Sequence, residues 1–147
     1  MRIRNARQQE ANALEALQRR SSDVWQEYRE QLAAHPDAIE FPQHFIDRGW
    51  TRVAVLGDNT PVGFSVVIPS EAGAHELDGL FVEPDHMRRG IGRSLVEDAC
   101  QRARNDGAHR LEVTVGPAQA FYEKLGFDVV GAVQTRFAPA VRMRRYL

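Results

Sequence analysis

The sequence has almost no cysteine, because Cys100 is the single one among 147 residues. One cysteine excludes an internal disulfide framework and a zinc site made of several thiolates, and it suits a reducing compartment. The sequence also lacks an apolar run of about 18 residues, the length that spans a bilayer. Its first residues, MRIRNARQQE, have no apolar core of a signal peptide. We therefore expect a cytoplasmic protein that does not enter a membrane.

Net charge is nearly absent as well, at −1 when histidine is counted as neutral. No overall field then attracts nucleic acid or an anionic membrane, so we expect neither as a partner, and any anion site must be local. The apolar fraction of 43% and the charged fraction of 27% are those of a folded globular protein. The length suits one domain, so we predict a single domain over residues 1–147.

The hydrophobic pattern predicts a chain that mixes hairpins with one strand–helix–strand crossover. Strands are predicted at residues 2–6, 51–57, 62–69, 75–84, 110–115, 127–133 and 140–147. Helices are predicted near residues 11–17 and at 21–34, 91–106 and 118–126, with turns or short helical pieces around Pro36 and Pro42. This order predicts an α/β or α+β fold, a mixed sheet of about six or seven strands with about four helices on its faces.

The stretch HMRRGIGRSL, residues 86–95, combines two glycines and three arginines at the start of a predicted helix. The first turn of a helix has backbone N–H groups without internal partners, and the helix dipole adds positive charge there. Gly90 and Gly92 carry no side chain that would hold a ligand away. Phosphate or pyrophosphate is the natural ligand of such a turn, and the arginines can add charge-assisted contacts.

A glycine-rich turn of this kind also occurs in phosphate loops, in dinucleotide sites and where glycines serve packing alone. The phosphate loop is excluded, because it needs Gly-Lys followed by Ser or Thr. The dinucleotide motif would place a third glycine at position 95, which is Leu95 here, and would follow its strand directly. A helix start whose glycines only allow close packing stays possible from these ten residues alone.

Two longer segments resemble the GNAT superfamily of N-acetyltransferases. LDGLFVEPDHMRRGIGRSLVEDACQRARNDG, residues 77–107, is similar to its acyl-CoA-binding segment: a strand, V-x-P, then [Q/R]-x-x-G-x-[G/A] opening a helix. RLEVTVGPAQAFYEKLGF, residues 110–127, is similar to the second half of the family pattern, and the hairpin at 53–67 looks like its second and third strands. The resemblance implies a single-domain GNAT-like fold whose splayed strands form an acyl-CoA cleft.

In this family the turn binds the pyrophosphate of acetyl-CoA through backbone amides, and the preceding strand pairs with the pantetheine arm as a peptide would. The resemblance therefore implies a cofactor-binding set made of Leu80, Phe81, Val82, Met87, Arg88, Arg89, Gly90, Ile91, Gly92, Arg93, Ser94 and Tyr122. The cosubstrate is acetyl-CoA, and no metal is expected. The sequence departs from the family at Met87, where Gln or Arg is usual, and at Gly116, where relatives commonly have Asn.

Tyr122 matches a tyrosine that many relatives use as general acid toward the leaving CoA thiolate. A phenol of pKa about 10 is close enough to a thiol of about 8.5 to share its proton. Asp78 and Glu76 lie two apart on one strand and so share a face; they are the candidate general bases, Asp78 first, and His75 and His86 are weaker candidates. The alternative for each is structural: Tyr122 as a packing residue, and the carboxylates as surface groups.

Two groups of residues are candidates for binding the acceptor. The aromatics Trp25, Tyr28, Phe41, Phe45 and Trp50 are either a substrate wall or ordinary core. Arg136, Arg142, Arg144 and Arg145 either favour an anionic acceptor or form a solvated strand face. The function we predict is acetyl transfer from acetyl-CoA to a primary amine, preferably of a small molecule. The alternatives are acetylation of a protein N-terminus or lysine, and a non-catalytic acyl-CoA sensor. A homodimer is expected from the resemblance alone.

Overall fold

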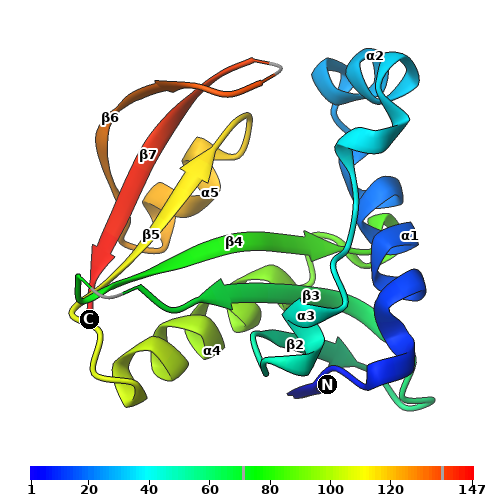
Figure 1. Ribbon diagram of the computed structural model, residues 1–147, viewed down its shortest axis with the longest axis horizontal. Helices are drawn as coiled ribbons and strands as arrows, with labels where there is room; N and C mark the ends of the chain where they lie inside the picture. The colour runs from blue at the N-terminus through cyan, green and yellow to red at the C-terminus, as the bar shows by residue number, and fades with distance from the viewer. Residues whose placement is uncertain (71, 137) are drawn as a thin grey trace. The chain divides into compact units, whose positions relative to one another are not determined.

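Figure 1 shows the computed structural model, in which residues 1–70, 72–136 and 138–147 are described. Over this part of the chain seven strands form one mixed sheet in the order β1-β2-β3-β4-β5-β7-β6. Their bounds are β1 Arg2–Asn5, β2 Thr51–Val55, β3 Pro61–Ile68, β4 Ala74–Val82, β5 Arg110–Val115, β6 Asp128–Gln134 and β7 Pro139–Tyr146. The predicted mixed α/β sheet is confirmed.

The described residues form five α-helices: α1 Ala11–Ser22, α2 Gln26–Ala34, α3 His44–Asp47, α4 Ile91–Asn105 and α5 Gln119–Lys124. Short 3₁₀ turns occupy Gln8–Glu10, Pro36–Ala38 and Pro84–His86. The prediction of a helix starting at Ser21 is wrong. Ser21 and Ser22 are buried at the end of α1, and α2 starts only after Trp25, whose backbone is extended. Serine is a common residue at helix starts. Here burial in the folded protein places both serines at the end of a helix, and local preference does not predict that burial.

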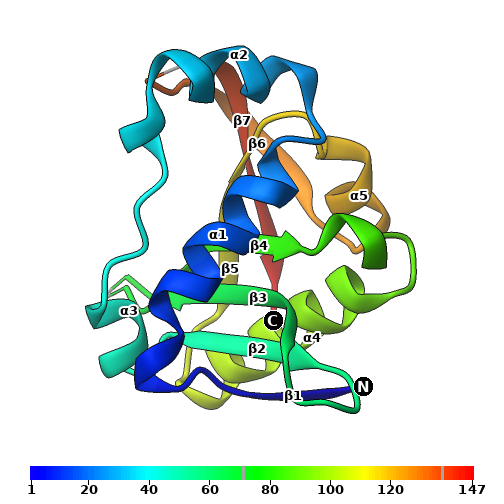
Figure 2. The same ribbon diagram turned by 90° about the vertical axis from the view of Figure 1, so that its right-hand side faces the viewer.

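The described chain divides into two compact units, the first made of residues 1–66 and 79–96. In this unit β1, β2 and β3 pair antiparallel, and successive residues of β3 face opposite sides of the sheet. A Cβ on Gly63 would meet Leu95 at 3.1 Å and Ile91 at 3.2 Å, so the start of α4 packs directly on that backbone. The next residue, Phe64, packs edge-on against Phe41 at 5.6 Å between ring centroids. The strands of this unit are thus covered on both faces (Figures 1 and 2).

The second unit contains residues 67–78 and 97–147. β5 pairs antiparallel with β7 from Arg110 to Val115, and β6 pairs antiparallel with β7 beyond it. The parallel pairing of β4 with β5 comprises three residue pairs, from Ala74 with Arg110 to Glu76 with Glu112. Along β5, Leu111, Val113 and Val115 are buried, whereas Glu112 and Thr114 face the other way, as the period of two requires. None of the helices in the described ranges is long and apolar enough to span a bilayer.

Candidate active site

The turn that joins β4 to α4 lies entirely in the first unit. After Val82 the backbone N–H of Glu83 donates to the Val62 carbonyl at 2.8 Å. The chain then makes a 3₁₀ turn, in which the His86 N–H donates to the Glu83 carbonyl at 2.9 Å. Helix α4 begins at Ile91, and its first internal bond runs from the Ser94 N–H to the Gly90 carbonyl at 3.0 Å. The amides of residues 91–93 precede that bond and are the ones that helix geometry leaves without internal partners.

Two residues of this turn have left-handed backbone conformations, Arg88 with φ of 64° and Gly90 with φ of 83°. Such a φ is costly for arginine, because its Cβ crowds the backbone. At Gly90 a Cβ would have no atom within 4 Å, so the space beside the backbone is open. The strain at Arg88 and the open side at Gly90 both suit a turn shaped to hold a ligand against its amides.

The three arginines of the turn have no bonding partner within the part of the chain that the structure describes. Arg88, Arg89 and Arg93 are all exposed, and none forms a hydrogen bond, an ion pair or a ring contact there. Their guanidinium groups therefore stay available to an anion. A helix start with open backbone amides and three available cations fits the pyrophosphate and 3′-phosphate groups of coenzyme A.

The strand residues predicted to bind the pantetheine arm precede the turn in the same unit. Leu80 and Val82 pack against a buried apolar cluster formed by Ala54, Val62, Ile91 and Leu95. The ring of Phe81 lies 5.3 Å from that of Phe64. Packing therefore holds the three side chains, and the ladder from β4 to β5 includes none of these residues. A peptide-like ligand requires this combination, a fixed strand with a backbone edge that another strand does not use.

Tyr122 lies on α5 in the second unit and is 7% exposed. Its ring packs edge-on between Phe121, at 5.1 Å, and Phe127, at 5.4 Å. Burial raises the pKa of its phenol well above the usual value, because the charged form would lose its hydration. Tyr122 therefore keeps its proton over the physiological pH range, which a general acid requires.

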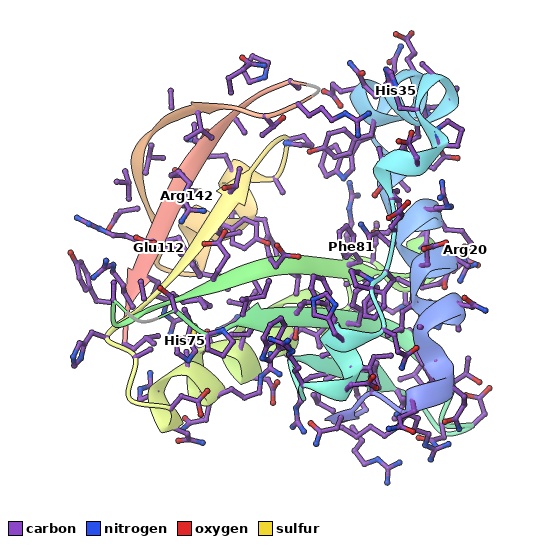
Figure 3. All side chains as sticks on the ribbon, viewed as in Figure 1. Arg20, His35, His75, Phe81, Glu112 and Arg142 are labelled. Carbon is purple, nitrogen blue, oxygen red and sulfur yellow. The ribbon has the colours of Figure 1, made fainter. Side chains whose placement is uncertain are left out.

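The two candidate bases of β4 have different surroundings, both within the second unit. Glu76 is held by Arg142, whose Nη1 and Nη2 donate to the two Glu76 oxygens at 2.7 and 2.9 Å. Arg142 also donates to Glu112 at 3.1 Å and to the Thr114 hydroxyl at 2.9 Å (Figure 3). These four bonds make Glu76 part of an ion-pair cluster in which Arg142 engages both of its carboxylate oxygens.

Asp78 keeps exposed surface, but nearby protein atoms remove part of the hydration of its carboxyl. This desolvation raises the pKa of Asp78 above its usual value, and the charge of Glu76 raises it further. A raised pKa makes Asp78 a stronger base than an ordinary aspartate. Both candidates remain predictions, as does the role of Tyr122.

The two histidines weighed as weaker bases are both partly enclosed. His75 is 5% exposed, and its Nε2 lies 3.2 Å from the Asp106 carboxylate. His86 lies in the 3₁₀ turn before α4. Nδ1 of each ring is buried without a hydrogen-bond partner in the described structure. Among the residues that the structure describes, no group of three or more His, Cys, Asp and Glu side chains is arranged to hold a metal ion.

The arginines near the C-terminus have bonding partners, unlike those of the turn. Arg142 holds Glu76 and Glu112, and Arg145 donates to both oxygens of Glu97 at 2.8 and 3.3 Å. The Arg144 guanidinium lies 5.1 Å from the ring centre of Tyr146, and Arg136 is not free either. These contacts within the protein favour neither a solvated strand face nor an anionic acceptor site for Arg142, Arg144 and Arg145.

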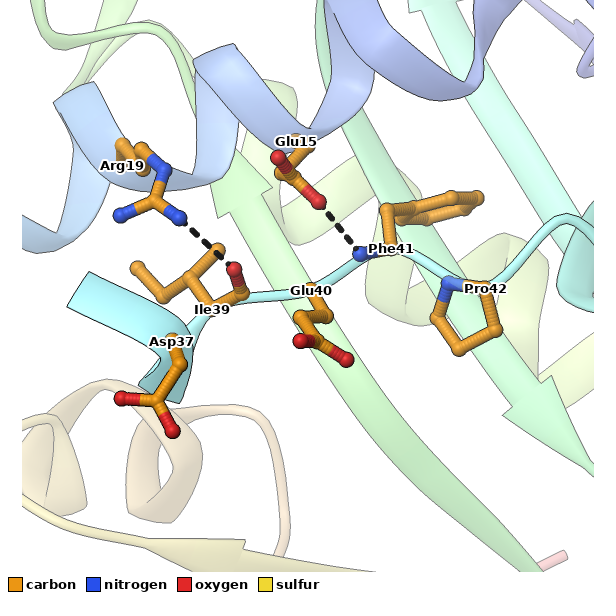
Figure 4. Close-up of a pocket in the computed structure, with 7 residues that line it drawn as sticks. All are labelled: Glu15, Arg19, Asp37, Ile39, Glu40, Phe41 and Pro42. Atoms are coloured by element: carbon orange, nitrogen blue, oxygen red, sulfur yellow. Dashed lines mark hydrogen bonds between the residues drawn. The ribbon is translucent and has the colours of Figure 1, made fainter. Parts of the chain in front are cut away.

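A pocket that sequence reasoning missed lies in the first unit, between α1 and the segment that follows α2 (Figure 4). Its volume is about 490 Å³, and it is lined by Glu15, Arg19, Asp37, Ile39, Glu40, Phe41 and Pro42. The Glu15 carboxylate accepts the Phe41 N–H at 2.9 Å, and Arg19 donates to the Ile39 carbonyl at 2.8 Å. The spacing of four between Glu15 and Arg19 puts both on one side of a helix, and this was the signal available in the sequence.

The predicted aromatic wall is divided between core and surface. Phe45 packs edge-on against Phe41, 5.8 Å away, and Trp50 lies 5.9 Å from Phe45. Tyr28 is half-buried, and burial raises the pKa of its phenol. Trp25 is 38% exposed at the start of α2. Phe41 is the member of the set that lines the pocket.

Comparison with known proteins agrees with the family suggested by the sequence. Residues 12–127 match the model of the acetyltransferase (GNAT) family. The peptidyl-lysine N-acetyltransferase YjaB of Salmonella typhimurium is 34% identical over 129 residues, covering 88% of this chain and 84% of the relative. YjaB of Escherichia coli is also 34% identical, over 137 residues, covering 88% of this chain and 83% of the relative.

Among solved structures, the PaiA N-acetyltransferase of Thermoplasma acidophilum in complex with coenzyme A has the same fold. Its TM-score is 0.79 at 21% identity, and the match covers 99% of this chain and 98% of that one. The family match extends from α1 through the turn to the end of the segment that carries Tyr122. The chain belongs to the GNAT acetyltransferase family and is an N-acetyltransferase.

Proposed function

We propose that this enzyme transfers the acetyl group of acetyl-CoA to the side-chain amine of a lysine in a protein, with residues 1–147 acting as one N-acetyltransferase domain. The observation that supports acetyl-CoA as the acetyl donor is the turn at residues 87–93, with open backbone amides and three arginines available to phosphate. The two YjaB relatives, both peptidyl-lysine N-acetyltransferases, support a lysine acceptor over the small-molecule amine that the sequence favoured. The acidic side chains of the pocket support a cationic acceptor.

Two segments of the first unit, residues 80–82 and 87–93, bind the donor in this proposal. The amides of residues 88–93 hold the pyrophosphate, and the arginines add charge-assisted contacts to it or to the 3′-phosphate. The backbone of residues 80–82 pairs with the pantetheine arm, while Leu80 and Val82 remain packed in the apolar cluster. Residue 87 is a methionine, so the contact of Met87 with the donor is made by its backbone.

The residues of the second unit carry the proton transfers. The acceptor nitrogen attacks the thioester carbon, a C–N bond forms, and the C–S bond breaks. Asp78 takes the proton that the nitrogen loses, and Tyr122 gives its proton to the departing sulfur. The raised pKa values of both groups support these roles, because one must accept a proton and the other must still carry one.

The test is release of free thiol from acetyl-CoA with a panel of acceptors: lysine peptides, peptides with a free N-terminus and blocked lysines, and small amines. We expect the highest kcat/KM with lysine peptides. A higher kcat/KM with small amines would instead support the small-molecule acceptor. Tight CoA binding without transfer to any acceptor would support the acyl-CoA sensor, for which Gly116 in place of the usual Asn is the favouring observation. Absence of CoA binding by calorimetry would contradict all three.

A further inference from the structure

The turn that binds the donor in our proposal is joined to α1 by one ion pair, within the first unit. Nε and Nη2 of Arg20 donate to the two oxygens of Glu83 at 2.6 and 2.8 Å. Arg20 stands in the last turn of α1 (Figure 3), and Glu83 is the first residue after β4. The pair is bidentate, which fixes the direction of the carboxylate as well as its distance.

Glu83 is placed where a small rotation would move the whole turn. Its backbone N–H is bonded to β3, and Pro84 follows it with a fixed φ. Of the described residues 83–93, Glu83 is the only one whose side chain has a hydrogen bond or an ion pair to another segment. The remaining backbone bonds of the turn are local, such as Met87 N–H to the Pro84 carbonyl at 3.3 Å. The Arg20 contact is therefore the side-chain restraint on the turn's orientation.

Helix α1 is a firm support for this restraint. Leu14 and Leu17 on its inner side are 0% and 1% exposed. Arg19, next to Arg20, donates to the carbonyls of Pro36 and Ile39 at 2.7 and 2.8 Å and so holds the pocket segment from another side. The helix cannot shift without disturbing both its core contacts and this segment.

We infer that Arg20 is a positioning residue for acetyl-CoA, acting through Glu83 to hold the turn and the end of β4 in the arrangement that accepts the donor. The inference rests on the proposed function of the turn. It does not place Arg20 in contact with the donor. It assigns to this pair part of the ordering of the turn, which would otherwise have to be completed when the ligand binds, at a cost to affinity.

A change at Glu83 separates positioning from simple electrostatics. Glu83→Gln removes a negative charge from a turn that binds an anion, so electrostatics alone predicts tighter CoA binding. Positioning predicts weaker binding, because the bidentate pair is lost. The matched control is Asp85→Asn, which removes the same charge from an exposed residue two positions later that has no bonding partner in the described structure.

The experiment measures Kd for CoA by calorimetry, and KM for acetyl-CoA and kcat with a lysine peptide. For Arg20→Ala and for Glu83→Gln we expect Kd and KM to rise about threefold to tenfold, the range of a well-formed partly exposed ion pair. We expect kcat and the KM for peptide to stay near wild type. Arg29→Ala, an exposed arginine of α2 without a bonding partner in the described ranges, and Asp85→Asn should not raise the Kd.

The double variant Arg20→Glu with Glu83→Arg should recover most of the lost affinity. The variants Arg20→Ala and Glu83→Gln combined should weaken binding no more than either alone, because both break the same pair. Unchanged or tighter CoA binding by Glu83→Gln would overturn the inference while leaving the proposed function intact. Failure of the wild-type chain to bind CoA would overturn both. If Arg20→Ala does not fold, Arg20→Lys and the charge exchange give the same comparison.

Discussion

The arginines of the turn and the arginines of β7 have the same chemistry and opposite surroundings. Arg88, Arg89 and Arg93 are exposed without a bonding partner among the described residues, whereas Arg142 and Arg145 are each bonded to glutamates through two nitrogens. Unpaired cations close together repel one another, so the first arrangement costs stability and is suited to an added anion. The second neutralises carboxylates that the sheet brings together. The comparison shows that bonding partners, and not residue type, distinguish arginines that are available to a ligand from arginines that hold the sheet.

The largest effect should come from removing the turn's cations together. Arg88→Ala, Arg89→Ala and Arg93→Ala combined should raise the Kd for CoA about 1,000-fold, since each charge-assisted contact contributes roughly a tenfold factor. The temperature of unfolding should stay the same or rise, because repulsion is relieved. Calorimetry with CoA and a thermal melt measure the two quantities. A large fall in the melting temperature would show that these arginines are structural after all.

A change in the second unit should alter the chemistry and spare the binding. Tyr122→Phe keeps the ring contacts with Phe121 and Phe127 and removes the proton donor. We expect kcat to fall about 100-fold, the usual contribution of a general acid, with the Kd for CoA unchanged. Steady-state kinetics with a lysine peptide measure kcat. Full turnover by this variant would remove Tyr122 from the mechanism.

Removal of a β7 arginine should lower the stability of the protein and leave its affinity for CoA nearly unchanged, the reverse of what is expected for the arginines of the turn. Arg142→Met leaves Glu76 without its cation, near Glu112, which keeps its contact with Arg110 at 3.2 Å. The free energy of unfolding should therefore fall by about 2 kcal/mol. Denaturant unfolding measures this loss, and calorimetry should show little change in CoA affinity. The control is Arg144→Met, which loses a ring contact with Tyr146 and no hydrogen bond to a glutamate. Equal stability of the two variants would contradict the structural role of the cluster.

The smallest expected effect is the change in melting temperature when Asp78 is replaced. Because its folded-state pKa is raised above the ordinary aspartate value of 3.8, its contribution to stability is present below that value and is lost as pH rises through the folded pKa. At neutral pH the ionised carboxylate therefore costs stability, and Asp78→Asn should melt slightly higher than wild type. The difference should vanish below pH 3.8, where both side chains are neutral. Melts across this pH range measure it, and a lower melting temperature at neutral pH would contradict the argument.

The same substitution should lower activity and remove the acid limb of the kcat/KM profile. That limb should lie above the usual range for aspartate, because a base works only after losing its proton and the pKa of Asp78 is raised. Glu76→Gln should keep this limb but move it to lower pH, because the charge of Glu76 contributes to the raised pKa of Asp78. If Asp78 is a functional carboxylate, its replacement should make the protein more stable and less active. Replacement of Glu76 should instead make the protein less stable, because Glu76 is bonded to Arg142.

Patterns within short segments predict much of the fold. All seven strands, and the start of α4 at Ile91, follow from periodicity and from the residues that end each element. The misplaced start of α2 has a physical reason: Ser21 and Ser22 are buried by contacts from elsewhere in the chain, so their preference for helix starts was overridden. The pocket beside α1 was missed because its lining combines a helix with a loop that has no regular pattern.

The sequence by itself predicted an anion-binding turn, because the requirements of such a turn are local: glycines without side chains, a helix start and clustered arginines within ten residues. Only the tertiary structure decided which charges are paired. Arg142 and Glu76 are 66 positions apart in the chain, and Arg20 and Glu83 are 63 apart. Charge pairing depends on distances of a few ångströms, and the folded backbone sets those distances for residues far apart in sequence. For that reason ten consecutive residues were enough to predict an anion site, whereas the ion pairs between distant residues could not be predicted from the sequence.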